Sequence, residues 1–319
     1  MLIVQKFGGS SLADISGLRR AAEIILSAVN RGCKVAAVVS AMGDSTDELC
    51  SFAHRISPKP CPRELDALLA TGELQSAALL SMMLCHLGQP AKSFSGPMAG
   101  IVCTAEYGDG EVISVSPTKV TTALNEGYIA VVAGFQGESE TGDVCTLGRG
   151  GSDTSAVALA AALGAEVCEI YKDVDGIYTA DPMLAKDAKL LSHIDFRDME
   201  ALTLRGSQVL HSRSVSTAMR EGLPMLILSS FKSCAGTAVC SLDDAQRPDF
   251  AGITRDKTKN SLSLVGKAVD ENCLERLCRL FKKENVEILS AELQMGCLSL
   301  CLKEEDLKRA LQLAHTEFF

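Results

Sequence analysis

The chain has 319 residues, enough to bury one large hydrophobic core or two smaller ones. Hydrophobic residues make up 47% of it and charged residues 22%, the balance of an ordinary globular protein. The net charge of −9 argues against nucleic acid as a main partner, and the absence of any run of about 18 uncharged apolar residues argues against a membrane span.

The first 230 residues alternate between predicted strands and helices. Leu2–Phe7 is a short apolar strand rather than a signal peptide, because it lacks a basic segment followed by a long apolar run. A long helix is expected to break near Thr71-Gly72, since glycine inside a helix costs about 1 kcal/mol relative to alanine. The predicted helices cover 16–30, 64–87, 118–126 and 152–163, and the other predicted strands cover 34–39, 129–133, 166–171 and 225–229. Nearly unbroken apolar strands joined by helices indicate an α/β fold with a mainly parallel sheet sandwiched by helices.

After residue 230 the composition changes. Residues 231–260 are rich in Ser, Asp, Arg, Lys, Gly and Pro, and we predict a linker with little regular structure. Strands are then predicted over 261–265, 286–293 and 297–302, with helices over 271–284 and 304–314. This β-α-β-β-α order predicts a small α+β, ferredoxin-like module over 261–319 that lacks an obvious final strand.

The cysteines and histidines do not indicate a disulfide framework or a zinc site. The 13 cysteines include no CxxC pair, and most lie inside apolar segments, so we expect buried thiols in a reducing, cytoplasmic environment. The five histidines do not cluster with cysteine at ligand spacing. No metal site made of side chains is therefore predicted.

The segment Lys6-Phe7-Gly8-Gly9-Ser10-Ser11 follows the first strand directly. Glycine N–H groups can bind phosphate oxygens, and a lysine can neutralise charge that builds during phosphoryl transfer. The segment lacks the Gly-x4-Gly-Lys spacing of a Walker A loop. Taken alone, it is better explained as an ordinary turn between a strand and a helix.

Another glycine-rich segment, Thr146–Ser155, opens the helix predicted over 152–163. A helix start presents unpaired N–H groups that suit an anion, and Arg149 could hold a carboxylate through two hydrogen bonds. Asp153 adds a negative charge that most anion sites would avoid. The combination suits a site for a small carboxylic acid together with a cation or a transferring group. A glycine-rich turn with an acidic residue in the first helical turn is the simpler alternative.

Three more polar segments lie at strand ends or interrupt a helix: Ser40–Leu49, Thr71-Gly72-Glu73 and Tyr171–Pro182. The first could be a helix cap, and the last could be two turns in succession. Ligands of parallel sheets bind beyond the carboxyl ends of the strands. We therefore expect these segments to converge on one site.

Together these segments, with Val132–Gly137, resemble the aspartokinases of the amino acid kinase family over about residues 1–230. The resemblance implies three parts: a catalytic domain over 1–230, a linker over 231–260, and a single, incomplete ACT-like module over 261–319. It implies an enzyme that uses ATP and Mg²⁺ to phosphorylate the side-chain carboxylate of L-aspartate to 4-phospho-L-aspartate. That step leads towards lysine, threonine and methionine, and a homodimer or higher oligomer is expected.

The resemblance also implies roles for individual residues. Lys6 and Asp153 would be catalytic, with Glu73 on the substrate ammonium and Arg149 on its α-carboxylate. The substrate site would also include Ser40, Thr46, Gly150, Gly151 and Ser152. The ATP site would include Lys6, Phe7, Gly8, Gly9, Lys172, Asp173, Tyr178 and Met183.

Two departures from the family pattern bear on activity. Met183 stands where the family usually has Arg, and Gln208 stands where it usually has Lys. Each lost cation would remove a charge-assisted contact to ATP worth roughly 1.5–3 kcal/mol, unless Arg205, Arg213 or Lys186 substitutes. The alternatives are thus an active aspartokinase, a degenerate non-catalytic partner or amino-acid-binding subunit, and a kinase for glutamate, acetylglutamate or a nucleotide.

The C-terminal module departs from the family as well. There is length for one ACT module where two are usual, and the usual turn after its first strand is replaced by Lys267–Asn272. Inhibition by lysine or threonine is therefore not expected. The module is a dimer contact, a regulatory unit or an accessory unit without a ligand.

Overall fold

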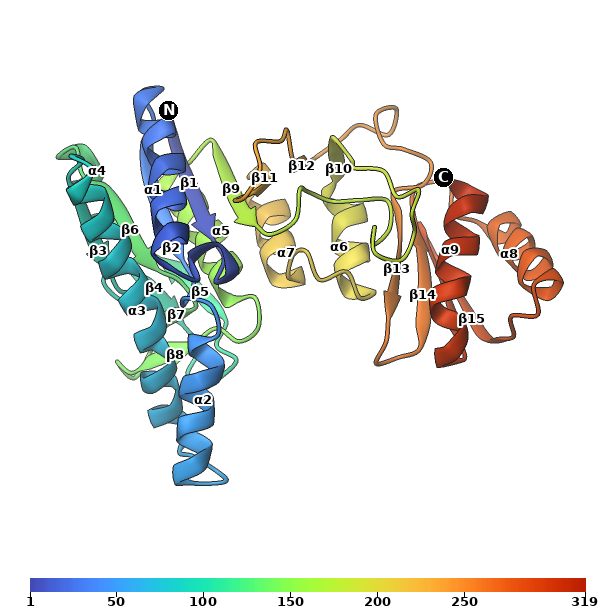
Figure 1. Cartoon of the computed structure of the whole chain (residues 1–319), viewed down its shortest axis with the longest axis horizontal. Coiled ribbons are helices and arrows are strands. Elements are labelled where there is room, and N and C mark those ends of the chain that lie inside the picture. Colours follow the sequence, from blue (N-terminus) through green and yellow to red (C-terminus); the bar gives the residue numbers. More distant parts are fainter. The chain divides into compact units, whose positions relative to one another are not determined.

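The computed structural model describes residues 1–319, which form two compact units (Figure 1). The first unit contains Met1–Asp175 and Arg220–Cys234, and the second contains Gly176–Met219 and Ala235–Phe319. This division differs from the predicted boundaries at 230 and 260. Residues 176–219 belong to the second unit, where Ile253 N donates to Thr179 O at 2.7 Å and Thr179 is hydrogen-bonded to His315 at 2.8 Å.

A parallel sheet forms the centre of the first unit, as predicted. Its strands run in the order β11-β9-β1-β2-β6-β3, and every pair is parallel. Their bounds are Met225–Ser229 (β11), Val167–Lys172 (β9), Leu2–Phe7 (β1), Lys34–Val39 (β2), Ile129–Ala133 (β6) and Ala91–Phe94 (β3). Most of these residues are buried, because helices cover both faces of the sheet.

Alternate residues of β1 point to opposite faces of the sheet. Ile3 and Phe7 join a hydrophobic cluster with α1 (Ile15–Asn30) and α3 (Pro62–His86). Lys6 faces the other side, where α5 (Gly151–Leu163) packs against β1, β2 and β9. The remaining helices of this unit are η1 (Ser10–Leu12), α2 (Ser45–Ile56) and α4 (Thr118–Asn125). This alternation buries Phe7 in the core and leaves Lys6 for the site.

A second, smaller sheet in the first unit was not predicted. Its strands run in the order β5-β4-β7-β8, with β4 (Ile101–Cys103), β5 (Val112–Val115), β7 (Gln136–Ser139) and β8 (Val144–Thr146). Each strand has only three or four residues. Strands this short carry too few alternations of apolar and polar residues to be recognised from sequence.

Helix α3 is continuous from Pro62 to His86, so the predicted interruption at Thr71-Gly72 is wrong. Gly72 is there because a Cβ at this position would lie 2.9 Å from the Cβ of Ala41. By length and composition α3 could also cross a membrane. In this fold it packs against α1, α2, β3 and β8, and it buries the polar residues Asp66 and Glu73 inside the unit.

The second unit is built on a four-stranded antiparallel sheet in the order β13-β14-β16-β15. The strands are β13 (Gly252–Asp256), β14 (Ser261–Val265), β16 (Cys297–Leu302) and β15 (Ile288–Gln294). Helices α8 (Glu271–Lys283) and α9 (Leu307–Phe318) share its hydrophobic core, and η2 (Glu304–Asp306) precedes α9. The predicted ACT-type fold is confirmed. The module has four strands because β13, which was not predicted, pairs with β14.

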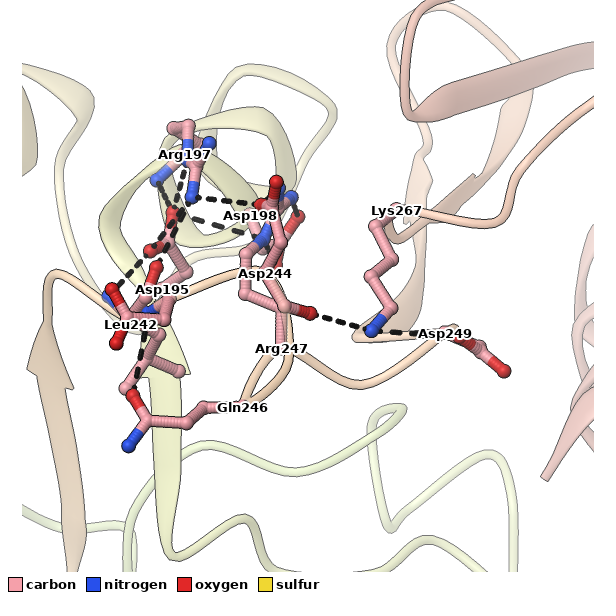
Figure 2. Close-up of polar contacts among 10 residues, drawn as sticks. Asp195, Arg197, Asp198, Leu242, Asp244, Gln246, Arg247, Asp249 and Lys267 are labelled. Carbon is pink, nitrogen blue, oxygen red and sulfur yellow. Dashed lines mark hydrogen bonds and ion pairs between the residues drawn. The ribbon is translucent and has the colours of Figure 1, made fainter.

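Residues 231–260 are not the irregular linker that we predicted. They contain β12 (Thr237–Cys240) and β13, and β12 pairs in parallel with β10 (His193–Asp195). Between β12 and β13, Arg247 lies 2.6 Å from Asp198 of α6 (Phe196–Leu204), and Lys267 lies 3.7 Å from Asp249 (Figure 2). Helix α7 covers Ser212–Glu221. The polar composition that indicated a linker instead supplies the ion pairs that fix this segment.

Candidate active site

Two lysines and one aspartate form the centre of the site. Lys6 lies near the end of β1, Lys172 ends β9, and Asp153 lies in the first turn of α5. Lys6 Nζ is 2.6 Å from Asp153 Oδ1, and Lys172 Nζ is 2.9 Å from Asp153 Oδ2. Each carboxylate oxygen therefore holds one ammonium group at the carboxyl edge of the parallel sheet.

This cluster is charged although it is buried. The side chains of Lys6 and Asp153 are 6% and 5% exposed. Burial alone would raise the pKa of Asp153, but the two lysines outweigh it and lower the pKa to about 2. Burial lowers the pKa of Lys6, and the neighbouring Asp153 opposes that change. The cluster keeps one net positive charge where an anion could approach.

The Gly8-Gly9 turn lies directly beside this cluster. Gly8 N donates to Tyr171 O at 3.2 Å, and a Cβ on Gly8 would lie 3.6 Å from Lys6 Nζ. A Cβ on Gly9 would lie only 2.8 Å from Ala41 O. Glycine is needed at position 9 because the turns after β1 and β2 meet there.

Phe7 contributes to this region only through its backbone. Its ring is fully buried and stacks on Tyr171 with the ring centroids 5.0 Å apart. We predicted Phe7 as part of the ATP site, and the burial of its ring excludes a side-chain contact with a nucleotide. Ser40, also predicted in the site, follows β2 and is half-buried, and its N–H donates to Phe7 O at 3.1 Å.

Glu73 is a buried carboxylate with one oxygen unpaired. Its Oε1 accepts from Ala41 N at 3.0 Å, and its Oε2 has no hydrogen-bond partner. Burial raises the pKa of Glu73 to about 7, against the opposing effects of the Ala41 N–H and the positive charge of Lys6. A cationic ligand at Oε2 would relieve this unfavourable burial.

Arg149 and Gly150 are exposed to solvent directly before the buried first turn of α5. Gly150 has φ 69° and precedes the helix, and a Cβ on Gly151 would lie 2.8 Å from the Cβ of Leu147. Ser152 is buried against Gly134. Arg149 itself is exposed, and its guanidinium makes no hydrogen bond or ion pair within the chain. It is therefore available for an anion.

The other predicted residues are more scattered. Thr46 lies half-buried in the first turn of α2, and Asp173 is exposed directly after β9. Tyr178 and Met183 belong to the second unit, where Met183 is 85% exposed. Their roles at a nucleotide stay predictions.

Of the cations considered as substitutes for the missing Arg and Lys, Arg205 is already engaged. It contacts Glu292 at 3.6 Å and donates to Gln294 at 3.1 Å within the second unit. Gln208, at the other departure, is exposed in the same unit.

Two positions that support the site were missed from sequence. Ser230 Oγ donates to Lys172 O at 3.0 Å and contacts Ser11 Oγ at 2.7 Å, which fixes the backbone beneath Lys172. Asp66 in α3 accepts hydrogen bonds from Thr146, next to the Arg149 segment. An acid among the apolar residues of a helix was the only available signal for Asp66, whereas the serines gave none.

Protein side chains alone do not form a metal site here. No three His, Cys, Asp or Glu side chains come close enough together to hold a metal ion. The acid nearest the site centre, Asp153, has both oxygens on lysine ammonium groups. The residues present therefore do not fit a metal held by the chain itself.

Known proteins resemble this chain in sequence and in structure. The model of the amino acid kinase family matches residues 1–229. An aspartokinase from Mycobacterium bovis is 47% identical over 269 residues, which is 83% of this chain and 64% of the relative. The chain thus spans less than two thirds of that relative's length.

Solved structures agree with this match. Aspartate kinase from Synechocystis has a TM-score of 0.69 and 30% identity, over 100% of this chain and 69% of the other. Aspartokinase III from E. coli, solved in complex with aspartate and ADP, has a TM-score of 0.74 and 26% identity, over 95% and 78% of the two chains.

Proposed function

Because the chain belongs to the amino acid kinase family, we propose that it transfers the γ-phosphoryl group of ATP to the side-chain carboxylate of L-aspartate. The product would be 4-phospho-L-aspartate, made in the cytoplasm on the route to lysine, threonine and methionine. The observation that carries this proposal is the buried Lys6–Asp153–Lys172 cluster beside the Gly8-Gly9 turn.

Positioning and charge neutralisation account for the chemistry. A carboxylate is already a nucleophile at neutral pH, so no general base is required. Lys6 and Lys172 bring two positive charges to the position of the transferring phosphoryl group, and Asp153 holds both ammonium groups in place. The N–H of Gly9 would bind a phosphate oxygen, because the N–H of Gly8 already donates to Tyr171 O. Preorganised donors of this kind cost little reorganisation in the transition state.

The substrate's two charged groups have separate partners in this proposal. Glu73 Oε2, buried and unpaired, would accept the α-ammonium group, and the free guanidinium of Arg149 would hold the α-carboxylate. A carboxylate and a guanidinium in one site suit an amino acid, which carries an ammonium group and a carboxylate, better than a simple dicarboxylate. Since the chain supplies no metal ligands of its own, we derive no step through Mg²⁺.

A coupled assay of ADP release with L-aspartate, L-glutamate or no acceptor tests the proposal. We expect turnover only with aspartate, and we expect Lys6→Ala to lower it by orders of magnitude while the fold stays intact. Lys34→Ala is the matched control, because Lys34 lies exposed at the other end of the neighbouring strand β2. Normal turnover by Lys6→Ala, or turnover with glutamate alone, would contradict the assignment.

A second candidate function is a non-catalytic, amino-acid-binding subunit. It is favoured by Met183 and Gln208, which are exposed and uncharged, and by the engagement of Arg205 with Glu292. This candidate predicts no ADP release, while aspartate still raises the melting temperature. Turnover with aspartate would exclude it.

A further inference from the structure

One buried acid of the first unit has no role in the proposed chemistry. Asp66 in α3 is 1% exposed and has no Lys, Arg or His partner. Its carboxylate accepts three hydrogen bonds, from Gly108 N at 2.9 Å, Thr146 N at 2.7 Å and Thr146 Oγ1 at 3.0 Å. Burying a carboxylate without a counter-ion is costly, and neutral donors offset that cost only while they stay in place.

These bonds fix the chain immediately before Arg149. All three polar atoms of Thr146 are engaged, since its carbonyl oxygen also accepts from Gly110 N at 2.9 Å. The next residue, Leu147, is buried and donates through its N–H to Phe135 O at 2.8 Å. The segment is therefore held firmly up to two residues before Arg149, whose own side chain is free and exposed.

The same helix carries the other group proposed for the substrate. Asp66 and Glu73 are seven residues apart, about two helical turns, so they lie on one face of α3. Between them, Ala70 O accepts from Gln136 Nε2 at 2.9 Å. One rigid element thus holds Glu73 and, through Asp66, the segment that carries Arg149.

We propose that Asp66 is a positioning residue that sets where Arg149 lies relative to Glu73, and thereby sets the affinity for an amino acid with an α-carboxylate. The inference rests on the proposed function, in which Arg149 binds that carboxylate. Asp66 itself contacts no substrate, and its effect passes through Thr146.

A double-mutant cycle on L-aspartate affinity, measured by titration calorimetry, tests this inference. Asp66→Asn keeps the shape but turns one acceptor into an NH₂ group that faces the donors. We expect it to weaken aspartate binding about tenfold or more and to leave ADP affinity within about twofold. In an Arg149→Ala background the same change should have almost no further effect on aspartate binding.

Two further variants keep the test decisive. Thr146→Val removes a single donor with little change in shape, and it replaces Asp66→Asn if that variant fails to fold. It should weaken aspartate binding about threefold, again only when Arg149 is present. Arg63→Ala is the control, because it removes an exposed ion pair between α3 and Asp143, which lies directly before β8, the strand that contains Thr146. It should leave aspartate affinity unchanged.

The outcomes separate this inference from the proposed function. An unchanged aspartate affinity in Arg149→Ala alone would contradict the proposed function and the inference with it. A clear effect of Arg149→Ala combined with an equal loss from Asp66→Asn in both backgrounds would overturn only the inference. In that case Asp66 would support the fold without acting through Arg149.

Discussion

The pKa of Glu73 makes a quantitative prediction about pH. Burial raises this pKa to about 7 in the free chain, so the carboxyl is mostly protonated below that pH. A bound ammonium group requires the ionised form, and binding must then release a proton. At pH 5.5 only about 3% of the sites are ionised, so aspartate should bind about 30-fold more weakly than at pH 8, a difference of about 2 kcal/mol.

Titration calorimetry between pH 5.5 and 8, in two buffers with different ionisation enthalpies, measures both the affinity and the protons released. We expect close to one proton released at pH 5.5 and almost none at pH 8. Glu73→Gln should bind weakly at every pH without this slope, whereas Glu48→Gln, on the exposed face of α2, should keep it. A flat affinity in the unmodified protein, or a slope that survives in Glu73→Gln, would refute the reasoning.

The same pKa should affect stability with a definite sign. The folded pKa lies above the ordinary glutamate value of 4.5, so the folded state holds the proton more tightly than the unfolded state does. The free energy of unfolding should therefore fall by about 3 kcal/mol as the pH rises from about 4.5 to 7. Glu73→Gln should lack this decline when unfolding is followed in denaturant at several pH values.

Three further changes have expected outcomes. Asp153→Asn leaves the buried ammonium group of Lys6 and the half-buried one of Lys172 without their shared counter-ion. It should abolish turnover and lower the free energy of unfolding by about 3–5 kcal/mol in denaturant titrations; a stable, active variant would contradict this. Gly72→Ala should lower the free energy of unfolding by about 1–3 kcal/mol, because the new methyl group would meet Ala41. Adding Ala41→Gly should recover part of that loss, and simple additivity of the two changes would argue against the contact. Arg247→Ala should lower the free energy of unfolding of the second unit by about 3 kcal/mol, since it leaves the buried Asp198 without its ion pair. Arg197 is half-exposed, so Arg197→Ala should lower it by less than about 1 kcal/mol. Equal losses from the two variants would contradict the difference in burial.

The sequence predicted the elements that rest on long, uniform patterns. Strands β1, β2 and β11 match their predicted ranges, because consecutive apolar residues are typical of a strand buried on both faces. Strand β13 was missed, because Ile253 is its one large apolar residue and the strand ends in Arg255 and Asp256. The small sheet that presents Thr146 was missed because its strands are too short.

The site residues could be predicted from sequence where glycines and charged residues are neighbours in the chain, as around Lys6 and Asp153. Residues outside such segments were harder to predict. Lys6 and Asp153 were expected near each other, and they form an ion pair. Lys172 was assigned to the nucleotide alone, yet its ammonium group lies on Asp153. The role of Asp66 depends on a contact across 80 residues of sequence, which no local pattern encodes. Such pairings follow from packing and could not be derived from composition or spacing.

The inclusion of residues 176–219 in the second unit limits how this chain can be divided. A Cβ on Gly206 would lie 2.4 Å from the carbonyl oxygen of Arg255, and the backbone of Thr179 is bonded to β13. A fragment cut after residue 230 would strip this stretch of the partners against which it folds. Chimaeras that exchange everything after residue 230 would thus separate residues 176–219 from the antiparallel sheet of their own unit. Recombination, in the laboratory or in evolution, would have to carry the stretch and the antiparallel sheet together as one inherited block.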